Sequence, residues 1–144
     1  MSPIEKDIIR RKMAVIVENL KALETIKEIN IEEYKDDIFR RKATERLLQE
    51  LIEAAIDINT HLIVQTGKRV PDDYFESFVK AGEYNIVPKD LAVKLAPSAG
   101  LRNRLVHEYD VLEHSIVLEA VNTAEDLYPK YIKAIEDYLQ EMNT

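Results

Sequence analysis

The sequence predicts an all-α fold, an up-and-down bundle of about five helices. Composition is the first reason, because only three of the 144 residues are glycine while Glu, Lys, Ile and Leu are plentiful. Periodicity is the second, because apolar residues recur at helical spacing over long stretches. No stretch alternates apolar and polar residues as a half-buried strand requires. We therefore expect residues 1–144 to form one domain.

The first helix is expected to begin at Pro3. Ser2 is placed to cap it, and Glu5 can reach back to complete a capping box. A break is expected near Asn30. The apolar stripe of this helix consists of Ile9, Met13, Ile16, Leu20 and Leu23.

A second, longer helix is expected over residues 32–65. Gly67 is suited to cap its C-terminus, and Pro71 prevents the helix from continuing. Its apolar stripe consists of Leu47, Leu48, Leu51, Ile52, Ala55, Ile58, Leu62 and Ile63.

Two shorter helices are expected in the next part of the chain. The third helix covers residues 72–81 and is stopped by Gly82. The fourth begins at Pro88, and Pro97 should kink or interrupt it before the helix resumes through residues 102–109.

The last helix is expected over residues 112–142, bent by Pro129. It carries tyrosines near helical spacing, at Tyr128, Tyr131 and Tyr138. These rings fit a core or an interface better than a base-stacking platform, because no basic groove accompanies them.

The net charge of −7 and the lack of cysteine narrow the possible functions. A general nucleic-acid binder needs a basic surface, so no DNA partner is expected and any RNA contact must use local basic clusters. Without cysteine there is no disulfide, no thiolate nucleophile and no cysteine metal site, which fits a reducing cytosol. The N-terminus does not read as a signal peptide, and no segment is apolar for long enough to cross a membrane. We expect a cytoplasmic protein without membrane contact.

The candidate functional residues lie in the octapeptide over residues 102–109, Arg-Asn-Arg-Leu-Val-His-Glu-Tyr. On a helix, Asn103 and His107 share a face, whereas Arg102 and His107 are separated by about 140° around the axis. Arg102 and His107 therefore cannot lie side by side on a regular helix. Either the long arginine side chain converges on the histidine at the helix edge, or the helix loosens, or a second copy supplies the other half.

These residue types suit RNA cleavage without a metal or another cofactor. A neutral histidine near pH 7 can take a proton from a ribose 2′-hydroxyl and, once protonated, can give one to the leaving 5′-oxygen. An arginine stabilises the charge that develops on phosphorus, and Asn103 could orient the imidazole or the phosphate. The same spacing also fits an ordinary solvated helix end, where Arg104 and Glu108 can form a surface ion pair.

The octapeptide resembles the motif of HepT-like proteins, small helical domains of the HEPN superfamily, in which Arg is followed by four residues, His, one residue and Tyr. Residues 45–63 resemble the central helix of that family. Its next short helix is similar to the segment that carries Pro71, Tyr74, Phe75, Phe78 and Gly82.

This resemblance implies the toxin of a toxin–antitoxin pair. The toxin would be a metal-independent ribonuclease that acts as a homodimer, with Arg102 and His107 from two copies lining one cleft. The implied partner is an MntA-type minimal nucleotidyltransferase antitoxin, which silences the toxin by transferring AMP to Tyr109.

Two other functions fit the chain. One is a non-catalytic helical binding module that presents a nucleotide or a tyrosine to a nucleotidyltransferase, and the other is a plain homodimeric scaffold. The presence of Arg102, His107 and Tyr109 together favours the nuclease.

Outside the octapeptide, the other polar groups are interpreted as structural or solvent-exposed rather than functional. Asp57 and His61 are four residues apart and fit a hydrogen-bonded pair at a core or dimer interface better than a metal site, and no metal is expected. His114 is expected at the surface. Basic clusters are expected to be solvated faces rather than binding sites for RNA or an acidic partner. They are Arg40, Arg41 and Lys42 with Arg46, and Lys68 with Arg69.

Overall fold

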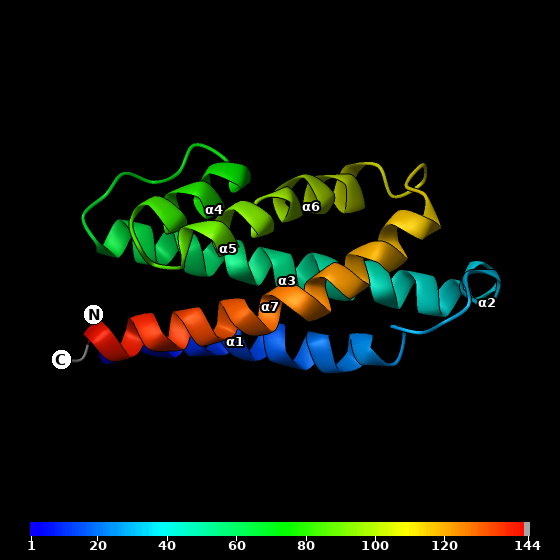
Figure 1. Ribbon diagram of the computed structural model, residues 1–144, viewed down its shortest axis with the longest axis horizontal. Coiled ribbons are helices and arrows are strands. Elements are labelled where there is room, and N and C mark those ends of the chain that lie inside the picture. Colours follow the sequence, from blue (N-terminus) through cyan, green and yellow to red (C-terminus); the bar gives the residue numbers. More distant parts are fainter. Residues whose placement is uncertain (143–144) are drawn as a thin grey trace.

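A computed structural model describes residues 1–142 and confirms the all-α fold (Figure 1). These residues form seven helices: α1 (Pro3–Glu24), α2 (Ile31–Asp36), α3 (Ile38–Gln65), α4 (Tyr74–Glu83), α5 (Lys89–Leu95), α6 (Pro97–His107) and α7 (His114–Met142). In Figure 1, α3 runs through the middle of the molecule, with α4, α5 and α6 on one side and α1 on the other, while α7 crosses α3 obliquely and ends beside α1. Both α1 and α6 pack directly on α3, so the central helix connects the two sides.

Two of the five expected helices are each divided, which accounts for the difference in number. The expected helix over residues 32–65 breaks at Asp37, whose extended backbone ends α2 and whose carboxylate accepts the Arg40 N–H at 3.0 Å to cap α3. The helix that follows Pro88 is interrupted at Pro97, as predicted, because proline has no N–H to donate. Pro97 then takes the first position of α6.

Two predicted helix ends are confirmed by their hydrogen bonds. Ser2 Oγ accepts the Glu5 N–H at 3.2 Å, and the Glu5 carboxylate accepts the Ser2 N–H at 2.9 Å, so the capping box is complete. At the end of α3, Gly67 adopts the left-handed conformation with φ 85°. The Lys68 N–H donates back to the Ile63 carbonyl at 3.3 Å, which satisfies a carbonyl in the last turn.

The end of α4 differs from the prediction, because Gly82 does not stop the helix. Gly82 lies inside α4, and the left-handed residue that follows the helix is Asn85, with φ 60°. The Ile86 N–H then donates to the Ala81 carbonyl at 2.9 Å. Gly82 instead allows α5 to approach closely, since a Cβ built there would lie 2.6 Å from the Cβ of Ala92.

Gly82→Ala is expected to destabilise the fold by about 1–3 kcal/mol, because α4 and α5 must separate to admit the added methyl group. Gly100 of α6 is the matched control, since a Cβ built there meets no atom within 4 Å. Gly100→Ala should raise the stability by up to about 1 kcal/mol through helix propensity. Urea unfolding followed by circular dichroism measures both variants, and equal midpoints would contradict the packing role of Gly82.

The hydrophobic core surrounds α3. The predicted stripe of α1 is entirely buried, and that of α3 is buried apart from the half-buried Leu47. Of the three tyrosines on α7, Tyr128 and Tyr131 lie in the core and Tyr138 is half-buried, as expected. The Tyr131 hydroxyl donates to Asn59 Oδ1 at 2.6 Å, and its burial raises the pKa of this phenol well above the ordinary value. A neutral, hydrogen-bonded phenol therefore ties α7 to α3.

The last helix, α7, continues through Pro129 without interruption, and a bend at this residue stays a prediction. Within residues 1–142, no helix combines the length and the apolar character that a membrane crossing requires.

Candidate active site

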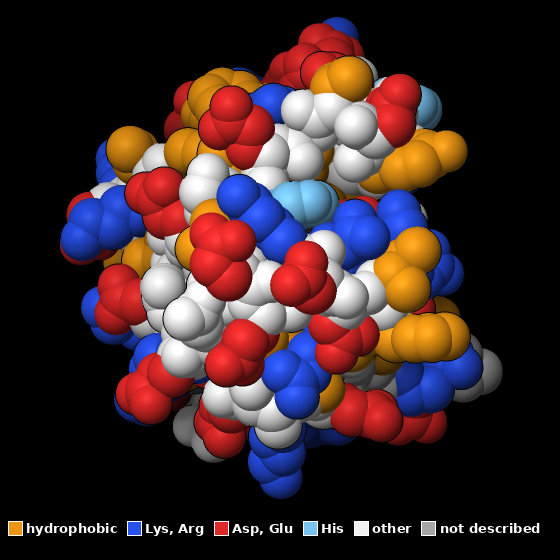
Figure 2. Space-filling model, turned by 90° about the vertical axis from the view of Figure 1, so that its right-hand side faces the viewer, with side chains coloured by type: hydrophobic (Ala, Val, Ile, Leu, Met, Phe, Trp, Pro, Cys, Tyr) orange, Lys and Arg blue, Asp and Glu red, His pale blue; other side chains and the backbone are white. Residues whose placement is uncertain are grey.

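The octapeptide occupies the last turns of α6 and the loop that follows. His107 is the last helical residue, and the Glu108 N–H closes the helix on the Arg104 carbonyl at 2.8 Å. Tyr109 therefore lies beyond the helix, in the turn that leads to α7. Figure 2 views this end of the bundle and shows one histidine side chain between Lys and Arg side chains near the centre and another, at the upper right, beside acidic and hydrophobic side chains.

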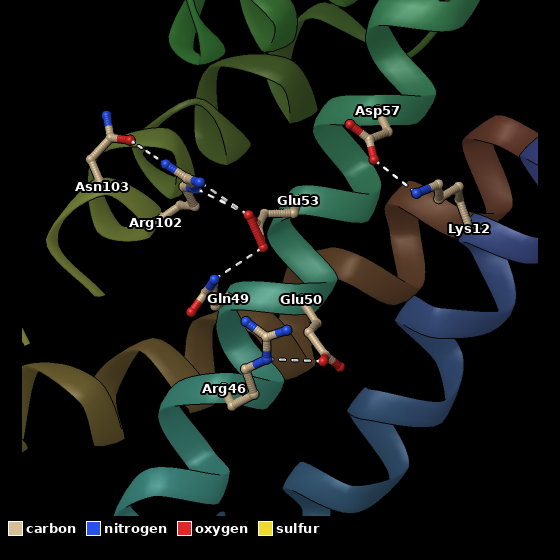
Figure 3. Close-up of polar contacts among 8 residues, drawn as sticks. All are labelled: Lys12, Arg46, Gln49, Glu50, Glu53, Asp57, Arg102 and Asn103. Carbon is tan, nitrogen blue, oxygen red and sulfur yellow. Dashed lines mark hydrogen bonds and ion pairs between the residues drawn. The ribbon is translucent and has the colours of Figure 1, made fainter. Parts of the chain in front are cut away.

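Arg102 is anchored inside its own chain (Figure 3). Its Nε and Nη2 donate to Glu53 Oε2 on α3, at 3.3 and 3.1 Å. The guanidinium also lies over the ring of Tyr74 at the start of α4, 4.9 Å from the ring centroid. Only 16% of the Arg102 side chain is exposed. These contacts fix both the position and the plane of the guanidinium.

Glu53 belongs to a row of partly buried polar side chains along α3 (Figure 3). Gln49 Nε2 donates to Glu53 Oε1 at 3.2 Å, so both carboxylate oxygens of Glu53 are engaged. One turn away, Arg46 pairs with Glu50 at 3.1 Å. Neither Glu53 nor Tyr74 is identifiable as a neighbour of Arg102 from the sequence, because periodicity along one helix gives no register against another.

His107 is exposed at the end of α6, and no hydrogen bond joins its imidazole to Arg102 within residues 1–142. Asn103 lies one turn before His107 on α6, as expected, and its side-chain oxygen accepts from Arg102 Nη1 at 3.2 Å. The surface ion pair that Arg104 and Glu108 could have made does not form within the described chain. One copy of the chain therefore presents the arginine and the histidine as separate groups.

Tyr109 is 55% exposed, so its hydroxyl is accessible. Its ring contacts α3 through Lys42, whose Nζ lies 4.9 Å from the ring centroid. The contact attaches the loop after α6 to the first turns of α3.

Two interpretations of histidines outside the octapeptide are wrong. Asp57 pairs with Lys12 of α1 at 2.9 Å and makes no hydrogen bond to His61. His114 is half-buried rather than at the surface, since its ring packs edge-on against Tyr34 with the centroids 5.7 Å apart. Among residues 1–142, no group of three or more His, Cys, Asp and Glu side chains is arranged to bind a metal ion.

Most residues of the two basic clusters form ion pairs with nearby acidic residues, as is typical of solvated faces. Arg40 pairs with Asp37 at 3.4 Å, and Arg69 pairs with Asp72 at 3.1 Å. Lys42 differs, because its nearest carboxylate oxygen, on Glu45, is 3.8 Å away and its ammonium faces an aromatic ring.

Fold and site together define a small helical domain in which α6 carries a largely buried arginine and ends at an exposed histidine, followed by an exposed tyrosine. The family model of ribonuclease HepT-like proteins matches residues 16–142, and the chain belongs to this family. The chain is 40% identical over 141 residues to the tRNA nuclease HepT of Aphanizomenon flos-aquae, covering 96% of this chain and 95% of that protein. It is also 28% identical to the mRNA nuclease HepT of Shewanella oneidensis, covering 90% and 97% of the two chains.

A solved structure extends the similarity to the fold. The tri-AMPylated HEPN toxin of Shewanella oneidensis, in complex with MNT antitoxin, superimposes with a TM-score of 0.82 at 28% sequence identity. The match covers 95% of this chain and 99% of that chain. The helices described above therefore have the arrangement of a HEPN domain.

Proposed function

We propose that this protein is the ribonuclease toxin of a toxin–antitoxin pair, with a composite site that forms between two copies of the chain. The observation that carries the proposal is the contrast between Arg102, held on α3 by Glu53, and His107, exposed at the end of α6. Membership of the ribonuclease HepT-like family supports the activity. The five-residue offset between the two residues supports a site that neither copy completes alone.

Arg102 retains donors for a phosphate. An arginine side chain has five N–H groups. Three of them take part in the contacts with Glu53 and Asn103, and two remain. Because Glu53 and Tyr74 hold the guanidinium in place, the free N–H groups are oriented before RNA arrives. They would bind the scissile phosphate and stabilise the additional negative charge of the transition state.

His107 would perform the proton transfers. Its neutral imidazole accepts the proton of the ribose 2′-hydroxyl, and the 2′-oxygen then forms a bond to phosphorus. The bond between phosphorus and the 5′-oxygen breaks, and the 5′-oxygen takes up a proton from an imidazolium or from water. The products are a 2′,3′-cyclic phosphate and a free 5′-hydroxyl, and neither step requires a metal ion. In a two-fold symmetric dimer, this chemistry would occur twice.

Tyr109 is the proposed site of regulation by an MntA-type nucleotidyltransferase antitoxin. Its oxygen would attack the α-phosphorus of ATP, forming an O–P bond while pyrophosphate leaves and the phenolic proton passes to solvent. The half-exposed ring makes the hydroxyl accessible to such an enzyme. The attached AMP adds bulk and negative charge next to the site for RNA phosphate, which would block the substrate. AMPylation of the Shewanella oneidensis HEPN toxin supports this regulation.

Expression with and without an MntA-type nucleotidyltransferase tests the proposed function. The protein alone should arrest growth and cleave RNA, whereas co-expression should relieve the arrest and add AMP to the peptide that contains Tyr109. Tyr109→Phe should remove the added mass. Tyr84→Phe is the control, because Tyr84 caps the C-terminus of α4, and it should retain the added mass. Unmodified wild-type protein after co-expression would contradict the regulation, and AMP addition without RNA cleavage would favour a non-catalytic binding module.

A further inference from the structure

We propose that Lys42 binds the phosphate of AMP once it is attached to Tyr109, so that the modified tyrosine is held against α3. The inference rests on the proposed function, since it requires AMP at Tyr109. It adds a binding site for a nucleotide phosphodiester, built from α3 rather than from the octapeptide.

Position is the first argument. Lys42 Nζ already lies 4.9 Å from the centroid of the Tyr109 ring. The Lys42 side chain is 51% exposed and the tyrosine is 55% exposed, so neither is locked in the core. A phosphate on the phenolic oxygen lies at the end of the same ring. The flexible lysine side chain can therefore reach it by a small rotation, without a change in the helix.

Charge is the second argument. The immediate neighbours of Tyr109 in the chain, Glu108 and Asp110, are exposed acidic residues that would repel a phosphodiester. A cation must compensate them if the phosphate is to rest against the protein. α3 supplies that cation next to the ring, and Lys42 is only weakly engaged by Glu45, at 3.8 Å.

The other basic residues near Lys42 are less suited to the role. Arg40 and Arg46 are already paired with Asp37 and Glu50, at 3.4 and 3.1 Å. Within residues 1–142, Lys42 is the cation whose charged group lies over the Tyr109 ring. Arg46, one helical turn further along the same face, is the next cation that an additional phosphate would meet.

Holding the phosphate has a consequence for inhibition. A nucleotide on a half-exposed tyrosine can swing into solvent, and it would then leave the site open for part of the time. An ion pair with Lys42 keeps the nucleotide between α3 and the end of α6. It also removes a cation that would otherwise attract the phosphates of RNA.

The test uses purified full-length protein that carries AMP on Tyr109. Lys42→Gln removes the charge, and Lys133→Gln is the matched control, because Lys133 is an exposed lysine that pairs with Asp137 on α7. Added phosphodiesterase should release AMP about fivefold faster from the Lys42→Gln protein than from wild type, as expected for the loss of one exposed charge contact. Intact-mass analysis follows the release. High salt should bring the wild-type rate up to that of the variant.

Residual RNA cleavage gives a second measurement. For each variant, the cleavage rate of the protein that carries AMP is divided by the rate of the same protein without AMP. The ratio should rise for Lys42→Gln and return to the wild-type value for Lys42→Arg. Equal AMP release from wild type, Lys42→Gln and Lys133→Gln would overturn the inference. If wild type and Lys42→Gln differ in AMP release but the wild-type protein cuts no RNA, the result would support the phosphate site and contradict the nuclease function. Absence of AMP on wild-type Tyr109 would overturn both the regulation and the phosphate site.

Discussion

His107→Ala is expected to lower RNA cleavage by about 10²–10⁴-fold, the contribution of a positioned general acid–base group. The variant should also cease to arrest growth. His107 is exposed at the end of α6, so its loss should leave the fold nearly as stable as before, within about 0.5 kcal/mol. Purified protein, a labelled RNA and a thermal melt measure the two effects separately.

His61→Ala is the control for this variant. His61 lies on α3, outside the octapeptide, and the ion pair that engages Asp57 does not involve it. This control should cleave RNA at the wild-type rate. A His107→Ala protein that cleaves as fast as the control would show that the imidazole is not part of the reaction.

Arg102→Ala is expected to lower cleavage by about 10²–10³-fold, because it removes the group that we propose stabilises charge on phosphorus. Arg102→Lys should also be strongly impaired. A lysine is a point charge, and it cannot bind Glu53 and Asn103 while presenting further donors to a phosphate in a fixed plane. Glu53 is left without its cation in Arg102→Ala but remains partly exposed to solvent, so we expect the protein to fold.

Single-turnover cleavage assays with saturating protein measure the effect on chemistry rather than on RNA binding. Arg104→Ala is the matched control on the same helix, since Arg104 makes no ion pair with Glu108 in the described chain. Equal cleavage by the Arg102 and Arg104 variants would contradict the assignment of Arg102.

The parts of the fold that depend on local signals were predictable. The capping box at Ser2 and the left-handed Gly67 follow from a few consecutive residues. The break at Asp37 was not, because an aspartate caps a helix only where the backbone has already left the helical conformation, and no glycine or proline marks the place. The role predicted for Gly82 was wrong, because glycine is favoured both where a helix stops and where two helices approach closely, and the sequence does not distinguish the two.

The same distinction between local sequence signals and helix packing applies to the candidate site. Arg102, His107 and Tyr109 were identifiable because they belong to one short motif. Glu53 comes from α3, 49 residues earlier in the chain, and only the packing of α6 on α3 brings it to Arg102. Packing also explains why the local expectation for Asp57 was wrong, because Lys12 of α1 forms an ion pair with it at 2.9 Å.

If one cleft takes Arg102 from one copy and His107 from the other, two inactive variants should complement each other. In a dimer of one Arg102→Ala chain and one His107→Ala chain, one of the two Arg102/His107 pairs that line the cleft has both residues intact and the other has neither. An equal mixture should recover about a quarter of the wild-type cleavage rate, because half of the dimers are mixed and each of these has one working pair instead of two. Native mass spectrometry would verify the mixed dimers before the RNA assay. Mixed dimers that cleave no faster than the separate variants would contradict the composite site.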